Sequence, residues 1–133
     1  MDSFRQCLQH ILTSREMQWP NGTPLYGYKL TDEEYERLSL SLTQSLKKRH
    51  IESFLGSSQD RSWAGAFVLF AAEWWRKSFC GGVWKWDPLF AHLGIGEEGL
   101  TAGQRNRLIQ NGLQYWRRPV LYRGYRNLYL LSV

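Results

Sequence analysis

The sequence predicts a mainly α-helical fold: a compact domain around one aromatic-rich central helix, with a small C-terminal β-hairpin that gives it a winged-helix outline. Three observations predict this class. Residues 62–79 are apolar nearly all round a helix, which is typical of a helix surrounded by other elements. Two capping boxes mark the starts of further helices. Residues 120–133 alternate on either side of a glycine turn, as the strands of a hairpin do.

The first half of the chain is predicted to hold two helices before the central one. Apolar side chains recur at helical spacing over residues 4–12, which predicts a short amphipathic helix. A turn-rich loop follows, and residues 25–30 are predicted to be extended or irregular. Thr31 and Glu34 have the spacing of a capping box, in which each side chain bonds the other residue's backbone N–H. This pattern predicts a helix over residues 32–50.

A basic triplet, Lys47, Lys48 and Arg49, ends this second predicted helix. Cations are favoured at a helix C-terminus because the helix dipole places partial negative charge there. The same side chains are also suited to contact with phosphate groups. The sequence leaves both interpretations of the triplet open.

The central helix carries rings at helical spacing at Trp63, Phe67, Phe70 and Trp74. It is too short and too interrupted to span a bilayer, which needs about 20 apolar residues. Glu73 lies among these rings, and a buried carboxylate is costly unless it is paired or hydrogen-bonded. We therefore predict that Glu73 accepts a hydrogen bond from a tryptophan indole or from an arginine.

Three further elements are predicted after the central helix. Glycines at 81–82 end that helix, and an Asp-Pro pair starts a short helix over residues 88–93. A second capping box at residues 101–104 starts a helix over 102–117, which ends before a proline. The hairpin over residues 120–133 completes the chain.

The positive charge is concentrated in the last quarter of the sequence. The net charge of the chain is +5, yet residues 101–133 hold six arginines and neither an acid nor a lysine, so the first hundred residues are slightly acidic overall. The planar guanidinium group suits phosphate and carboxylate partners. A basic patch of this size indicates an anionic partner, although acids elsewhere in the fold would equally pair with it.

The helix predicted over 102–117 is the best candidate for a nucleic-acid contact. One stripe along it holds the types of side chain that pair with base edges and phosphates. With a short helix before it and a hairpin after it, it has the outline of a winged helix-turn-helix, whose second helix enters the major groove. The predicted DNA-binding side chains are Gln104, Arg107, Asn111, Gln114 and Arg118 on the helix, with Arg123 and Arg126 on the hairpin. Any amphipathic helix shows a polar face, so that plainer interpretation stays open.

Aromatic side chains in the predicted extended segments offer a second kind of surface. They alternate at Trp84, Trp86, Tyr122, Tyr125 and Tyr129. Rings interleaved with arginine stack the bases of a single strand. Such rings also serve as core, or as a docking surface for the rest of the protein or for a partner.

Motifs for catalysis, metal binding and export are absent from the sequence. It has no phosphate-binding, dinucleotide-binding, zinc-protease or nucleophile-elbow motif, and its histidines are isolated, so we expect no enzyme and no cofactor. Cys7 and Cys80 form neither a metal-binding pattern nor a disulfide framework, so no metal site is predicted. The N-terminus lacks a signal-peptide pattern, so we expect a cytoplasmic protein without contact to a membrane.

Several segments resemble the N-terminal region of an uncharacterised family of long bacterial proteins. The matching segments are residues 22–34, 67–76, 81–88, 104–105 and 112–119, and the most specific pair is AAEWWR followed by GGVWKW. Members of that family lie in mobile and phage-defence islands beside large helicases, so the resemblance implies a defence context of the Druantia type. It implies a modular role and no reaction, because the family offers no catalytic residues to carry over.

Together these observations predict one domain over residues 1–133, the N-terminal piece of a longer protein. Its predicted function is non-catalytic recognition within a bacterial anti-phage defence protein, by binding DNA through the basic helix and the hairpin. The alternative is a protein–protein docking module for the remainder of the defence protein or for a partner helicase.

Overall fold

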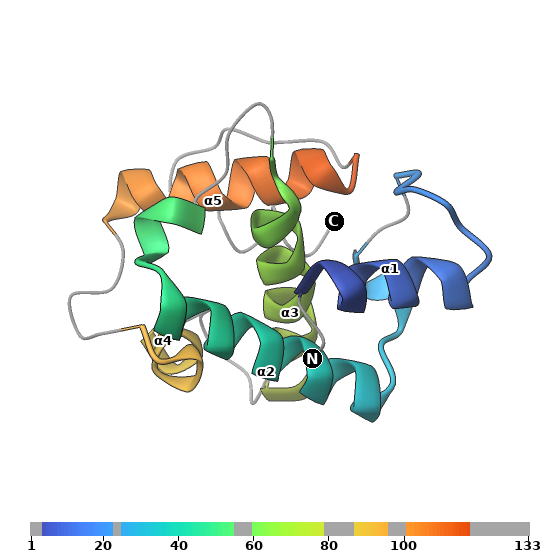
Figure 1. Cartoon of the computed structure of the whole chain (residues 1–133), viewed down its shortest axis with the longest axis horizontal. Coiled ribbons are helices and arrows are strands. Elements are labelled where there is room, and N and C mark those ends of the chain that lie inside the picture. The colour runs from blue at the N-terminus through green and yellow to red at the C-terminus, as the bar shows by residue number, and fades with distance from the viewer. Residues whose placement is uncertain (1–3, 23–24, 55–59, 79–86, 96–100, 118–133) are drawn as a thin grey trace.

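The computed structural model describes residues 4–22, 25–54, 60–78, 87–95 and 101–117. Within these ranges every regular element is helical, which confirms the mainly α-helical class (Figure 1). The elements in chain order, with η for a 3-10 helix, are α1 (Phe4–Ser14), η1 (Leu25–Tyr28), α2 (Asp32–Lys48), η2 (Ile51–Phe54), α3 (Ser62–Ser78), α4 (Asp87–Leu93) and α5 (Ala102–Tyr115). The hairpin predicted over residues 120–133 lies outside the described residues.

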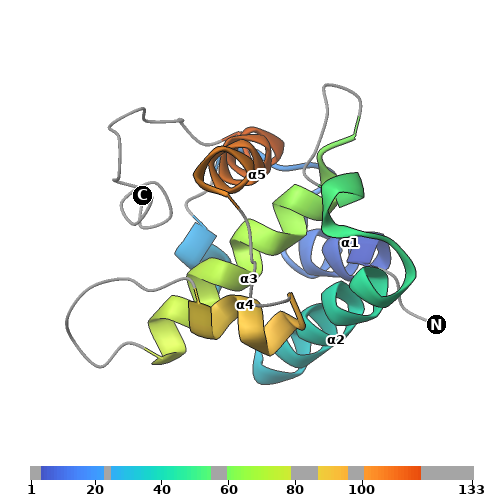
Figure 2. The same ribbon diagram turned by 90° about the vertical axis from the view of Figure 1, so that its left-hand side faces the viewer.

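Helix α3 is the centre of the fold, as the sequence predicts. Helices α1, α2 and α5 and the short element η1 all pack on it (Figures 1 and 2). All residues from 63 to 71 are buried. Their rings continue into neighbouring elements: Trp63 stacks on Phe54 of η2 with centroids 5.0 Å apart, and Phe70 stacks on Tyr35 of α2 at 4.9 Å. Because each buried ring removes roughly 150–250 Å² from water, these aromatic contacts supply much of the burial energy.

Helix α5 crosses α3 at a point where each helix has a glycine. A Cβ atom on Gly112 would lie 2.5 Å from the carbonyl oxygen of Ala64, and one on Gly65 would overlap the ring of Tyr115. Both contacts are far inside van der Waals distance, so only residues without a side chain allow this approach. The buried indole of Trp116 then donates its N–H to the carbonyl oxygen of Gly65 at 2.7 Å. This hydrogen bond holds the C-terminal end of α5 on α3.

Helix α4 packs on α2 and α3. Figures 1 and 2 both place α4 towards the C-terminal end of α3, whereas α5 crosses its N-terminal half. The apolar side of α4 contacts both helices: Phe90 stacks on Phe67 of α3, and His92 bonds Ser39 of α2. The winged-helix outline also needs the hairpin, which lies outside the described residues, so it stays a prediction.

The local structure differs from the sequence prediction at residues 25–28 and at three helix ends. Residues 25–28 form a 3-10 helix instead of an extended stretch, because Leu25 and Tyr28 are both drawn into the core. The ends of α1, α2 and α5 differ by two residues from the predicted ends at 12, 50 and 117. Among the described helices, none combines the length and the apolar character that crossing a bilayer requires.

Candidate nucleic-acid interface

The polar stripe predicted on α5 lies opposite the buried side of that helix. The side chains that face α3 and the core are Leu108, Ile109, Leu113 and Trp116. On the outward face, Arg107 and Gln114 are exposed, whereas Gln104 and Asn111 are half-buried. The structure therefore brings these four predicted residues together on one face of α5. The predicted contacts Arg118, Arg123 and Arg126 lie outside the described residues, and so do Trp84, Trp86, Tyr122, Tyr125 and Tyr129.

The side chain of Gln104 belongs to the N-terminal cap of α5. Its Oε1 accepts the backbone N–H of Thr101 at 3.0 Å, and Thr101 Oγ1 accepts the backbone N–H of Gln104 at 3.1 Å, which confirms the predicted capping box. The Nε2 group of Gln104 donates to Glu52 Oε1 on η2 at 3.5 Å. Gln104 therefore ties the start of α5 to the segment that follows α2.

Asn111 is held by Arg61, which lies just before α3. The Nε of Arg61 donates to Asn111 Oδ1 at 3.1 Å, and Asn111 Nδ2 donates to the carbonyl oxygen of Arg107, one turn earlier on α5, at 3.0 Å. These two bonds engage the acceptor and one donor of the amide. Arg61 is thereby placed beside the outward face of α5. Sequence reasoning missed this residue because it lies 50 positions before Asn111.

The C-terminal end of α5 adds a further exposed cation. Arg117 follows the C-cap Trp116 and adopts a left-handed backbone conformation with φ of 59°, which ends the helix. The loop after α1 lies against this end, because a Cβ on Gly22 would be 3.4 Å from the carbonyl oxygen of Arg117. That loop carries Trp19, whose side chain is 59% exposed.

The basic triplet Lys47, Lys48 and Arg49 is exposed at the C-terminal end of α2. No ion pair joins these three side chains to a carboxylate within the ranges that the structure describes. Figure 1 shows η2, which follows α2, beside the start of α5. The hydrogen bond from Gln104 to Glu52 joins these two elements, so η2 connects the end of α2 to the start of α5.

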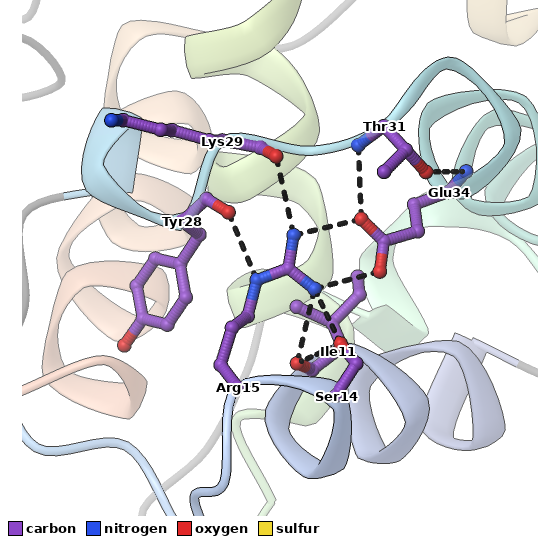
Figure 3. A network of polar contacts seen from close by, with 7 residues as sticks. All are labelled: Ile11, Ser14, Arg15, Tyr28, Lys29, Thr31 and Glu34. Carbon is purple, nitrogen blue, oxygen red and sulfur yellow. Dashed lines mark hydrogen bonds and ion pairs between the residues drawn. The ribbon is translucent and has the colours of Figure 1, made fainter.

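Cations near the other end of α2 are neutralised by acids. The guanidinium of Arg15 faces the carboxylate of Glu34 and donates to Oε2 at 2.7 Å and to Oε1 at 2.8 Å (Figure 3). It also donates to the carbonyl oxygens of Ile11, Tyr28 and Lys29. The hydrogen bond from Arg15 is the main reason that the pKa of Glu34 lies below its ordinary value of 4.5. This network joins the end of α1, the segment after η1 and the start of α2.

Further ion pairs surround this network. They join Arg5 to Asp60 at 2.7 Å, Arg37 to Glu33 at 2.9 Å, Lys77 to Asp32 at 2.9 Å and Arg76 to Glu73 at 2.7 Å. All three acids in the first turn of α2 thus have a cationic partner. The groove above the network has a volume of ≈ 520 Å³, and its lining mixes acids with cations, so it favours no single class of ligand.

Glu73 is fully buried, and Arg76 one turn later pairs with it. Arg76 donates to Glu73 Oε2 from two nitrogens, at 2.7 and 3.2 Å, which confirms the predicted arginine partner. Because Glu73 is bonded in this way and Arg76 is exposed on the helix surface, the pair is an internal contact of α3.

Other chemistry is sparse in the described part of the chain. His92 Nε2 lies 3.0 Å from Ser39 Oγ, a pairing that no sequence pattern indicated, and the imidazole stacks on Phe70 and lies tilted against Trp74. These contacts attach α4 to α2 and α3. Across the described ranges, His, Cys, Asp and Glu do not gather into groups of three that could hold a metal ion.

Comparison with known proteins identifies the family. A sequence model of the YjiT N-terminal domain matches residues 1–133. The chain belongs to the YjiT N-terminal domain family. Protein YjiT of Escherichia coli (strain K12) is 34% identical to this YjiT N-terminal domain over 123 residues. The match covers 86% of the chain and 21% of the E. coli protein, so it spans about a fifth of that relative's length. No solved structure matches the chain.

Two groups of cations can be distinguished among the residues that the structure describes. One group pairs with carboxylates around α1, the first half of α2 and the end of α3. The other lies on or beside α5 and at the end of α2, and we call it the cationic edge. Its members are Lys47, Lys48, Arg49, Arg61, Arg107 and Arg117.

Proposed function

We propose that this domain binds DNA through the outward face of α5, as a non-catalytic recognition domain. The observation that supports the proposal most directly is the composition of that face. Helix α5 contains no acidic residue, and its exposed positions carry cationic and neutral polar side chains. A surface of this kind attracts a polyanion, and phosphate contacts supply most of the affinity in sequence-independent binding to DNA.

The geometry gives the residues of this face different roles. Arg107 is exposed on the face and contacts phosphate, with Arg61 and Arg117 beside it. The side chains of Gln104 and Asn111 already hold the cap of α5 and Arg61 in place, so they position the cations. Because these two amides are engaged, the described face suits phosphate contacts better than the reading of base edges.

The further predicted contacts complete this proposal. Arg118, Arg123 and Arg126 are the further DNA contacts in this proposal, because they follow α5 in the sequence in a stretch without acids. We place the domain in a bacterial anti-phage defence protein and in the cytoplasm. The support for that setting is the resemblance of segments such as AAEWWR and GGVWKW to proteins from phage-defence islands.

Charge reversal on α5 tests DNA binding. We expect Arg107→Glu to weaken binding of a labelled 20-base-pair duplex about tenfold or more in 50 mM salt, because a phosphate contact becomes a repulsion. The matched control is Arg37→Glu, an equal change of charge at an exposed helix position on α2, and it should bind like the wild type. Fluorescence anisotropy measures both affinities. Equal binding by wild type and Arg107→Glu would rule out α5 as the DNA contact.

A protein-docking module is the second candidate. It is favoured by two large apolar side chains that stay exposed, Trp19 at 59% and Leu40 at 58%. The same titrations separate the two functions when they are repeated in 200 mM salt. Binding through phosphates weakens steeply over that range, whereas an apolar docking contact does not.

A further inference from the structure

We propose that the basic triplet Lys47, Lys48 and Arg49 is a second phosphate-binding element, which holds the same DNA duplex that α5 contacts. This inference rests on the proposed function of α5. In this inference the triplet binds phosphate groups of the duplex. It also interacts favourably with the helix dipole at the C-terminus of α2.

Segment η2 connects the triplet to the start of α5. Helix α2 ends at Lys48, and η2 follows within a few residues. Glu52 of η2 accepts the hydrogen bond from Gln104 in the first turn of α5, and Arg107 lies one turn further along the same face. The major groove is about 12 Å wide and is bordered by phosphates, so an element beside a helix that contacts DNA meets the sugar-phosphate backbone.

The basic residues at the C-terminal end of α3 show what such residues do when they serve only the fold. Both α2 and α3 end in basic residues, as the helix dipole favours. At the end of α3, Arg76 and Lys77 pair with Glu73 and Asp32. At the end of α2 the triplet has no such carboxylate partner among the described residues. Its charges therefore remain available to an external anion.

The arrangement of the triplet favours DNA over a single anionic group. Successive residues on a helix project about 100° apart, so Lys47 and Lys48 fan outwards instead of lining one pocket. A duplex presents one negative charge per about 1.7 Å of its axis, which gives each cation its own phosphate. Lysine is also a flexible point charge that needs no fixed geometry for such a contact.

Removal of the three charges tests the inference. We expect the variant Lys47→Gln/Lys48→Gln/Arg49→Gln to bind a 20-base-pair duplex about tenfold more weakly in 100 mM salt, and to lower the slope of log K against log salt by about two to three. The control Arg5→Gln/Arg37→Gln/Lys77→Gln removes three charges from exposed ion pairs and should keep the wild-type slope. An unchanged slope in the triplet variant would overturn the inference, while loss of binding in Arg107→Glu alone would still support α5.

Lysine footprinting on the wild-type chain gives a measurement that needs no variant. We expect bound duplex to slow acetylation of Lys47 and Lys48 at least fivefold, while Lys77, which pairs with Asp32 at the C-terminal end of α3, reacts at the same rate with and without duplex. If all three lysines react equally fast with and without bound duplex, the triplet does not touch DNA. If poly-glutamate protects the triplet as well as the duplex does, the site belongs to an acidic protein segment instead, and the assignment to DNA is wrong.

Discussion

The two ends of α2 carry opposite charges and differ in what those charges contact. At the N-terminal end, Asp32, Glu33 and Glu34 each pair with a cation, and two of those cations come from other elements. At the C-terminal end, Lys47 and Lys48 are exposed without a carboxylate partner among the described residues. The helix dipole favours both sets equally, so it does not explain the difference.

The difference shows where the fold uses charge for its own stability. The Arg15–Glu34 pair links segments that lie 19 residues apart and is mostly removed from water, with side chains 21% and 8% exposed. Exposed charges contribute little to the stability of the fold. Their interaction with an external anion does not require an internal ion pair to be broken. The first end of α2 therefore serves folding, and the second end is available for binding.

The largest expected effect is at the first end. We expect Arg15→Met to lower the free energy of unfolding by about 2–3 kcal/mol, because it leaves the Glu34 carboxylate buried without its partner. Three carbonyl groups lose a donor as well. The control Arg37→Met removes an exposed pair on the same helix and should cost less than about 0.5 kcal/mol. Urea unfolding followed by circular dichroism measures both, and equal losses would contradict the comparison.

A pH dependence of intermediate size is expected from the same pair. The pKa of Glu34 is lowered in the folded state, so the unfolded state binds more protons as the solution becomes acidic. The stabilisation is complete above the ordinary value of 4.5 and is lost as the pH falls through the lowered value. In Glu34→Gln this part of the acid dependence should vanish, so stability should fall less steeply between neutral pH and pH 3. Melting temperatures across that range measure the slope, and an identical slope in Glu34→Gln would exclude this source.

The smallest effect on stability is expected at the second end. Neutralisation of Lys47, Lys48 and Arg49 should lower the free energy of unfolding by less than about 1 kcal/mol, since only the interaction with the helix dipole is lost. The same variant is the one expected to lose affinity for DNA. Urea titration of this variant measures the loss. A loss as large as that of Arg15→Met would show that the triplet has a structural partner, and the contrast between the two ends would fail.

Elements with a local signal could be predicted from the sequence. Both capping boxes, at Thr31 and Thr101, depend on residues three positions apart, and both form as expected. The burial of α3 follows from its own composition. The partner of Glu73 is one turn away, so an arginine could be proposed for it.

Contacts between distant segments could not be predicted in this way. Arg61 reaches Asn111 across 50 residues, and Arg15 reaches Glu34 across 19. Nothing in the pattern of α4 indicates that it packs on α2 and α3. For the candidate site, the sequence identified the helix and its stripe, but which side chains of the stripe are already engaged depends on tertiary neighbours.

The crossing of α3 and α5 determines the orientation of the outward face of α5. Since Gly112 lies against the backbone of Ala64, turning α5 by one residue about its axis would drive a larger group into the backbone of α3. The rotational setting of the helix is thus fixed by the interior of the domain. The backbone of Arg107 is therefore held on the side of α5 away from α3 by the packing of the domain alone.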